Sequence, residues 1–394
     1  MGSCALYIHF PFCKHKCIYC DFYSITLLRS KKQFILSLLK EIQFYHSNPP
    51  FDFNSFSTLY FGGGTPSLLT PDEFYLILKT IRTFFKLTPD VEISIEANPG
   101  TVLEQHLLAY RKAGINRMTI GVQSFNDNEL KILTRIHSAK QAIKAIQSAR
   151  QAGIDNIGID LIFGIPGQSP ASWRQNLEQA VDIRPRHISM YGLTYEPGTP
   201  LTKAVEKGEL LKCDEELERD MYLTGIEFLE NAGYEQYEIS NFALPGDRSQ
   251  HNQKYWDGSC YIGLGPSAHS YDGAHRWWNV ADVNSYCDKL TKGHLPVEKK
   301  EILTKNHKLE ELVLLGLRRV QGINLPEWKQ LSKRDLLHQA ENVINQIGGI
   351  DTTTLPFKSC KSGKLLTKTN QSLCLTREGL LLYDTICEKL LDII

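Results

Sequence analysis

Short β-branched or aromatic runs alternate with longer segments of helical period along the first half of the chain. The strand candidates have the length and composition of buried strands and lie at residues 5–10, 58–61, 92–96, 117–122, 156–161 and 187–193. The helix candidates between them lie at 32–45, 71–85, 103–113, 139–152 and 171–181. Strands and helices that alternate in this way form a parallel α/β sheet. Six units are too few to close an eight-stranded barrel, so we expect an open, partial (β/α)6 barrel of the TIM type.

The rest of the chain predicts a smaller second domain. A helix candidate at 215–232 is followed by an aromatic- and glycine-rich stretch. Beyond residue 300, helical stretches precede two short strand-like pieces and a closing helix, an order typical of a small α+β domain of winged-helix type. We therefore expect a partial barrel at 1–200, a barrel extension at 201–300 and a winged-helix-like domain at 301–394.

The charge balance and the hydropathy of the chain bear on its partners and on its cellular compartment. Lys plus Arg equals Asp plus Glu at 44 each, which gives no electrostatic reason to expect nucleic acid as a partner. No apolar run is long enough for a transmembrane segment, and the first residues lack the pattern of a secretory signal, so we expect a cytoplasmic protein. In that reducing compartment, a close group among the ten cysteines indicates metal or redox chemistry rather than disulfides.

Cys13, Cys17 and Cys20 form such a group directly after the first strand candidate. Three thiolates at this C-x3-C-x2-C spacing can hold three irons of a cubane cluster and leave the fourth iron open for another ligand. The alternative is a zinc site completed by His15 or another side chain. The run by itself favours iron–sulfur over zinc and leaves both open.

Further polar and glycine-rich features follow the next strand candidates. The segment Gly-Gly-Gly-Thr-Pro at 62–66 ends the second strand, where consecutive glycines let backbone groups approach a ligand closely. Glu96 and Asn98 follow the third strand, Gln123 follows the fourth and Asp160 ends the fifth. Because the carboxyl ends of barrel strands share one rim, these side chains are expected to surround one ligand site beside the cysteines.

With these motifs in order, the chain resembles the radical S-adenosylmethionine (SAM) superfamily, and within it the family of oxygen-independent coproporphyrinogen III oxidases and their haem-chaperone relatives. The resemblance implies a 4Fe-4S cluster on the three cysteines and SAM as cofactor. Tyr19 is then expected beside the cluster. The further positions that the resemblance implies as SAM contacts are Tyr7, Gly63, Gly64, Thr65, Glu96, Gln123, Arg135 and Asp160.

Two departures move the expected function away from the oxidase. The oxidases carry another cysteine two positions beyond the third cluster ligand, where this chain has Phe22, and they have a longer segment before the cluster than the twelve residues that precede Cys13. A further segment, His-Asn-Gln-Lys-Tyr-Trp at 251–256, resembles a signature of the chaperone branch. That resemblance implies a haem-binding role for His251, whereas a core-packing histidine is the plain alternative.

Three functions remain open from the sequence. The first is a radical SAM-type haem chaperone that binds haem as cargo and delivers it to haem-requiring proteins. The second is an enzyme, an oxygen-independent coproporphyrinogen III dehydrogenase that forms protoporphyrinogen IX, and the third is a zinc-stabilised binding protein. The expected partners are haem or a porphyrinogen, a low-potential electron donor and haem-accepting proteins. No catalytic residue is assigned.

Overall fold

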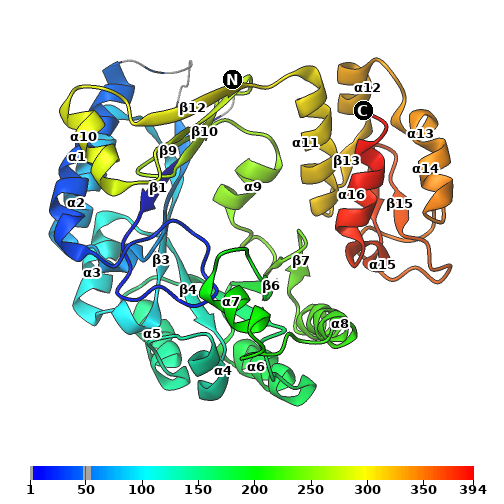
Figure 1. Cartoon of the computed structure of the whole chain (residues 1–394), viewed down its shortest axis with the longest axis horizontal. Helices are drawn as coiled ribbons and strands as arrows, with labels where there is room; N and C mark the ends of the chain where they lie inside the picture. The colour runs from blue at the N-terminus through cyan, green and yellow to red at the C-terminus, as the bar shows by residue number, and fades with distance from the viewer. Residues whose placement is uncertain (1–2, 48, 50–54) are drawn as a thin grey trace. The chain divides into compact units, whose positions relative to one another are not determined.

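In the computed structural model, which describes residues 3–47, 49 and 55–394, the chain forms two compact units (Figure 1). The first unit comprises the chain through Glu235 together with 242–254 and 259–300, and the second comprises 236–241, 255–258 and 301–394. Most of the stretch expected as a barrel extension therefore belongs to the first unit.

The first unit is built on six parallel strands. They are β1 (Cys4–Phe10), β2 (Phe56–Gly63), β3 (Leu87–Ala97), β4 (Arg117–Gln123), β5 (Asn156–Phe163) and β6 (His187–Gly192). Each pairs in parallel with the next one along the chain. The main helices between them are α1 (Lys31–Ser47), α2 (Pro71–Phe84), α3 (Glu104–Ala113), α5 (Ala139–Gln151) and α6 (Pro170–Ile183). The expected partial barrel is confirmed.

Local signals in the sequence explain where these helices begin and end. Thr70 and Glu73 form a reciprocal capping box at the start of α2, with Pro71 in its first turn. Gly114 ends α3 with φ of +120°, a conformation that glycine adopts without a Cβ penalty. One short helix, α4 (Asp127–Ile132), was not expected, because six residues are too few to show a helical period.

The sheet does not close into a complete barrel. β9 (Tyr261–Leu264) pairs in parallel with the free side of β1, and β10 (His269–Tyr271) pairs antiparallel with both β9 and β11 (His275–Asn279). The full strand order is β12-β11-β10-β9-β1-β2-β3-β4-β5-β6-β8-β7, where β12 is Val297–Ile302, β8 is Asn241–Ala243 and β7 is Glu235–Gln236. The added strands extend the open side of the partial barrel.

The second unit is a small α+β domain. Its four-stranded sheet has the order β13-β16-β15-β14 (Ile323–Asn324, Ser372–Leu375, Leu366–Lys368 and Ile350–Asp351). Its helices are α11 (Lys305–Arg318), α12 (Leu325–Ser332), α13 (Leu336–Gln339), α14 (Glu341–Gln346), α15 (Arg377–Leu380) and α16 (Tyr383–Leu391). The two strand-like pieces and the closing helix expected from the sequence are present. Among the described residues, every helix is too short or too polar to cross a membrane.

Candidate functional site

The loop after β1 carries the three cysteines, is closed on itself by main-chain hydrogen bonds and is joined to the barrel by Thr134. Cys13 N donates to Ile25 O at 3.0 Å, and Cys20 N donates to Cys17 O at 3.1 Å. In the middle of the loop, Ile18 N donates to Thr134 Oγ1 at 2.9 Å. The loop is therefore closed at its base by Cys13 and Ile25 and joined to the barrel at its centre.

The glycine run after β2 makes room for this loop. Gly64 N donates to Phe10 O at 2.8 Å, and a Cβ on Gly64 would lie only 2.8–2.9 Å from backbone atoms of Phe10 and Phe12. Gly63 has φ of +104°, and a Cβ there would lie 2.7 Å from the His9 ring. The glycines thus let the cysteine loop and His9 pack against the strand end, a role in addition to the ligand approach expected from the sequence.

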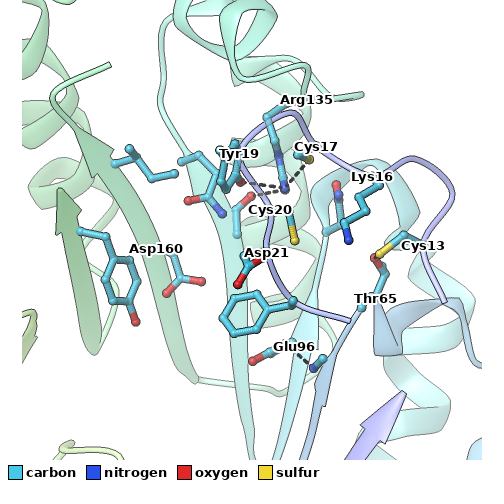
Figure 2. A pocket seen from close by; sticks show the side chains of 18 of the residues that line it. Cys13, Lys16, Cys17, Tyr19, Cys20, Asp21, Thr65, Glu96, Arg135 and Asp160 are labelled. Carbon is cyan, nitrogen blue, oxygen red and sulfur yellow. Dashed lines mark hydrogen bonds between the residues drawn. The ribbon is translucent and has the colours of Figure 1, made fainter. Parts of the chain in front are cut away.

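A cavity of about 550 Å³ opens at the carboxyl ends of the strands, and Figure 2 shows side chains of the cysteine loop and of the strand ends around it. Most of the residues expected in the site line this one cavity: Cys13, Cys17, Tyr19, Cys20, Gly63, Gly64, Thr65, Glu96, Gln123, Arg135 and Asp160. Segments separated by more than 140 residues in the sequence therefore converge as the shared strand rim predicts.

Two of the cysteine sulfurs accept hydrogen bonds from rim side chains. Thr65 Oγ1 donates to Cys13 Sγ at 3.3 Å, and Arg135 donates to Cys17 Sγ at 3.5 Å and to the Tyr19 hydroxyl at 3.4 Å (Figure 2). Arg135 also donates to Gly121 O at 2.7 Å, while its buried Nε has no hydrogen-bond partner among the residues that the structure describes. Donors directed at sulfur stabilise thiolates, so this donor set fits cysteines that hold an iron–sulfur cluster.

All three thiols line the cavity. In the part of the chain that the structure describes, no three His, Cys, Asp or Glu side chains lie close enough to share one metal ion. Burial raises the pKa of Cys20, and the neighbouring thiols of Cys17 and Cys13 raise it further. Metal ligation lowers such a pKa because the bound form is the thiolate.

Two partly buried carboxyl groups line the inner part of the cavity. Glu96 accepts hydrogen bonds from the Tyr60 hydroxyl at 2.9 Å and from Gly63 N at 3.2 Å. Burial raises the pKa of Glu96 to about 7 and the pKa of Asp160 to about 6. The Glu96 carboxyl is therefore partly protonated at neutral pH, and a cationic ligand would favour its charged form.

Gln123 reaches the cavity through an unusual backbone conformation. Its φ is +67°, in the left-handed region that side-chain-bearing residues rarely adopt, and the register of β4 with β5 shifts between Ile120 and Gln123. Such conformations cost about 1–3 kcal/mol and concentrate at functional sites. Asn98, at the same rim, also lines the cavity, but its side-chain oxygen accepts from Gly100 N at 3.1 Å as a cap.

Two expected site residues lie deeper in the barrel and do not line the cavity. The Tyr7 hydroxyl lies 3.1 Å from His9 Nδ1. His251 belongs to α9 (Gln250–Trp256), is 1% exposed and stacks on the Tyr60 ring at 4.8 Å. Its Nδ1 lies 2.8 Å from Thr58 Oγ1, and burial lowers its pKa to about 3, so it is neutral.

Several cavity residues were not expected from the sequence. Tyr191 and Gly192 end β6, and Lys16 and Asp21 come from the cysteine loop. Thr134, which anchors the loop, sits at φ of +53° in the turn after α4. Tyr191 lies at the carboxyl end of β6, where the rule for barrel strands places ligand-facing side chains, whereas a lone threonine in a turn gives no sequence signal.

The fold and the cavity together define a radical SAM protein, and the comparisons with known proteins agree. Residues 7–180 match the family model described as the radical SAM superfamily, and residues 303–382 match the one described as the HemN C-terminal domain. A structure of coproporphyrinogen III oxidase (HemN) from Escherichia coli superposes with a TM-score of 0.81 at 23% identity, covering 98% of this chain and 90% of that one. This likeness is one of fold.

Sequence relatives narrow the class to a family. Heme chaperone HemW of Mycobacterium tuberculosis is 37% identical over 324 residues, which cover 81% of this chain and 83% of that protein. Heme chaperone HemW of Synechocystis is 34% identical over 403 residues, covering 98% of this chain and 96% of that protein. The chain belongs to the HemN-like family of radical SAM proteins, together with the proteins named HemW.

Proposed function

We propose that this chain is a haem chaperone of the radical SAM type, which holds a 4Fe-4S cluster and SAM in the rim cavity, binds haem and delivers it to haem-requiring proteins. The observation that carries the cofactor part is the convergence of the three loop cysteines with Gly63, Thr65, Glu96 and Asp160 on one cavity. The haem part rests on the relatives, several of which are named haem chaperones.

Cys13, Cys17 and Cys20 would hold the cluster. Thr65 and Arg135 donate to two of the sulfurs and thereby stabilise their negative charge. Cys13 and Cys17 are buried, at 8% and 9% exposure, which limits the access of water. When bound, such a cluster supplies one electron to the sulfonium of SAM, for which the chain needs a low-potential electron donor.

The inner wall would bind SAM. Glu96 and Asp160 face the cavity with raised pKa values, and both can stabilise a cationic ligand by losing their protons. Gly63, Gly64 and Thr65 offer a backbone edge on one side, and Gln123 offers an amide on the other. The buried thiols of Cys13 and Cys17 would limit the access of water to the bound sulfonium.

The coproporphyrinogen III oxidase function is the alternative. The fold likeness to the Escherichia coli oxidase keeps it open. The residue two positions beyond Cys20 is Phe22, which lines the cavity and is 71% exposed. Phe22 thus gives the cavity an exposed apolar ring where the oxidases have a further cysteine. This difference favours the haem-chaperone function over the oxidase function.

Metal content tests the cofactor proposal. Protein purified without oxygen is expected to contain about four irons and four sulfides per chain. A Cys20→Ser variant should lose most of the iron, whereas Cys213→Ser, a cysteine outside the cavity lining, should retain it. Zinc without iron or sulfide would reject the iron–sulfur proposal and favour the zinc-stabilised alternative.

Two assays separate the chaperone from the oxidase. Reduced, cluster-loaded protein is incubated with SAM and coproporphyrinogen III, and no protoporphyrinogen IX is expected. The same protein is expected to take up haem and to transfer it to an apo haem protein, followed by the Soret band of the acceptor. Accumulation of protoporphyrinogen IX would overturn the chaperone proposal.

A further inference from the structure

Two cysteines lie side by side at the amino-terminal end of β1, away from the cysteine loop. Cys4 is the first residue of β1, and Cys260 directly precedes β9. Ala5 pairs with Tyr261 in the parallel ladder of these two strands, and Ala5 N donates to Cys260 O at 3.1 Å. Because alternate residues of a strand share a face, the two cysteines point to the same side of the sheet. The register therefore brings their side chains together.

The two thiols are in direct contact. Both are free in the structure, and the Cys4 thiol donates a hydrogen bond to the sulfur of Cys260. Neighbouring strands lie about 4.8 Å apart, which is within the range of Cα separations that a disulfide spans, about 4.4–6.8 Å. The register of β1 with β2 shifts at Cys4, and Cys260 lies just before its ladder begins. The two sulfurs can therefore join through a small adjustment at the strand ends.

The surroundings make the two thiols unequal. Cys260 is partly exposed, whereas Cys4 is 4% exposed. The hydrogen bond from Cys4 lowers the pKa of the Cys260 thiol, against the opposing effects of burial and of the Asp272 carboxylate. The same hydrogen bond, together with burial, raises the pKa of Cys4. Cys260 is therefore the thiol that ionises and meets solvent, and Cys4 is the protonated thiol behind it.

This pair is separate from the cysteines of the proposed cluster. β1 begins at Cys4 and ends at Phe10, so its seven residues span roughly 20 Å. The cluster cysteines follow the carboxyl end of that strand and line the rim cavity, whereas Cys4 lies at its amino end. Oxidation of Cys4 and Cys260 would therefore use thiols that the proposed cluster leaves free.

The pair lies on the seam that joins the added strands to the six-stranded sheet. β9 pairs with β1 over four residues, and β10, β11 and β12 follow it outward in the strand order. At the other end of this seam, Gly265 packs so closely that a Cβ would clash with the carbonyl group of His9. A bond between Cys4 and Cys260 would thus restrain both β9 and the strand that leads into the cysteine loop.

We propose that Cys260 and Cys4 are a peroxide-sensitive thiol pair, in which Cys260 is oxidised first and Cys4 then closes a disulfide with it. This modification site goes beyond the proposed function and does not depend on it. The sequence predicts a reducing compartment, where disulfides are transient and serve catalysis or redox sensing. An exposed, ionised thiol beside a second thiol is the arrangement that such sensing requires.

The reaction consumes one peroxide for two thiols. The Cys260 thiolate attacks one oxygen of hydrogen peroxide and the O–O bond breaks. The hydroxide that leaves takes up the proton released by Cys260, which gives a sulfenic acid and water. The Cys4 sulfur then attacks the sulfenic sulfur, so that an S–S bond forms and the S–O bond breaks. The proton of Cys4 leaves with that oxygen as a second water, and the two electrons lost by the thiols are those gained by the peroxide.

Peptide mapping of the full-length, cluster-loaded protein tests the pair. After treatment with hydrogen peroxide and alkylation of the remaining thiols, digestion without reductant is expected to give a peptide in which Cys4 is linked to Cys260, and dithiothreitol should remove the link. Cys213→Ser is the matched control, because Cys213 is also partly exposed, but burial and the nearby carboxylates of Glu218 and Asp214 raise its pKa. Its yield of linked peptide should stay within about twofold of the parent.

Two variants test the order of events. Cys4→Ser lacks the thiol that closes the bond, so dimedone, which traps sulfenic acids, should label Cys260 about tenfold more than in the parent. In Cys260→Ser, Cys4 should stay unlabelled, because it is buried and protonated. Iron and sulfide contents equal to those of the parent show that each variant is folded.

Two results in the parent protein would overturn the proposal without any variant. One is that Cys213 is oxidised while Cys260 can still be alkylated. The other is a linked peptide that joins Cys260 to a cluster cysteine instead of Cys4. Because the mapping detects the two thiols directly, its result is independent of haem binding, and a failure of the proposed function is seen separately.

Discussion

At the scale of single residues, Gly63 combines two demands that no other residue type meets. Its φ is +104°, and a Cβ would lie 2.7 Å from the His9 ring. Gly63→Ala is expected to lower the free energy of unfolding by about 2–4 kcal/mol, because backbone strain and a steric clash add. Chemical denaturation measures this loss, and iron content after reconstitution should fall with it.

Gly198→Ala is the control for Gly63→Ala. Gly198 also has a positive φ, +85°, but no described atom lies within 4 Å of its added Cβ. Its substitution should cost only backbone strain, about 1 kcal/mol, and leave the iron content unchanged. Equal losses in the two variants would show that His9 moves aside and that the contact with Gly63 is not tight.

Glu96 gives a pH dependence to cofactor binding. In the ligand-free protein its pKa is raised to about 7, chiefly by burial and further by Asp160, so its carboxyl is mostly protonated at pH 6 and mostly ionised at pH 8. A cationic ligand binds the ionised form and releases the proton. The affinity for SAM is therefore expected to rise about tenfold from pH 6 to pH 8.

Calorimetry with the oxidised cluster, which leaves SAM uncleaved, measures that rise. In Glu96→Gln the rise should be largely lost, since the amide does not titrate. Asp160, whose pKa is raised to about 6, would account for a residual slope at the acid end. If the SAM affinity of Glu96→Gln rose with pH as steeply as that of the parent, the titrating group would be one other than Glu96.

At the scale of elements, the sequence predicts the strands and helices, which depend on the local periodicity of side chains. It does not predict features that depend on how distant elements pack together. The six strands and their main helices follow from runs and periods of side chains, and the rim cysteines, Glu96, Gln123 and Asp160 follow from the rule that parallel strands end together. The depth of Tyr7 and the burial of His251 could not be predicted, because both depend on a helix packed across the strands.

The placement of α9 depends on Glu92 of β3. Its carboxylate accepts from His251 N at 3.0 Å and from Gln250 N at 3.2 Å, the first two amides of the helix. Glu92→Ala is expected to destabilise the fold by about 1–2 kcal/mol, the usual cost of a lost N-terminal cap, and Glu92→Gln by less, since its amide oxygen still accepts. Urea denaturation compares the two, and equal effects would assign the contribution to charge alone.

At the scale of the whole molecule, the two units should respond separately to substitution. In the second unit, Arg318 Nε lies 2.8 Å from the buried Glu238 carboxylate, and its guanidinium lies 4.5 Å from the Trp256 ring. Arg318→Ala would leave Glu238 without this cation. Since Arg318 is partly exposed, we expect the free energy of unfolding to fall by about 2 kcal/mol, which is less than the loss for a fully buried ion pair.

Hydrogen exchange locates this effect of Arg318→Ala. Amides of α11 and of the strands of the second unit should exchange faster, while those of β1 to β5 should keep the rates of the parent. Faster exchange throughout the barrel strands would show that the two units unfold as one.

The helix α9 packs against β2 and β3 inside the partial barrel. The helix contacts the amino-terminal parts of β2 and β3 through Thr58 and Glu92, and beneath the rim cavity an inner chamber of about 60 Å³ is lined by Glu96, Asp160 and Asn252 of α9. Because Glu96 and Asp160 line both this chamber and the rim cavity, a ligand bound at the rim would rest on two carboxyl groups whose other side faces a water-sized polar space.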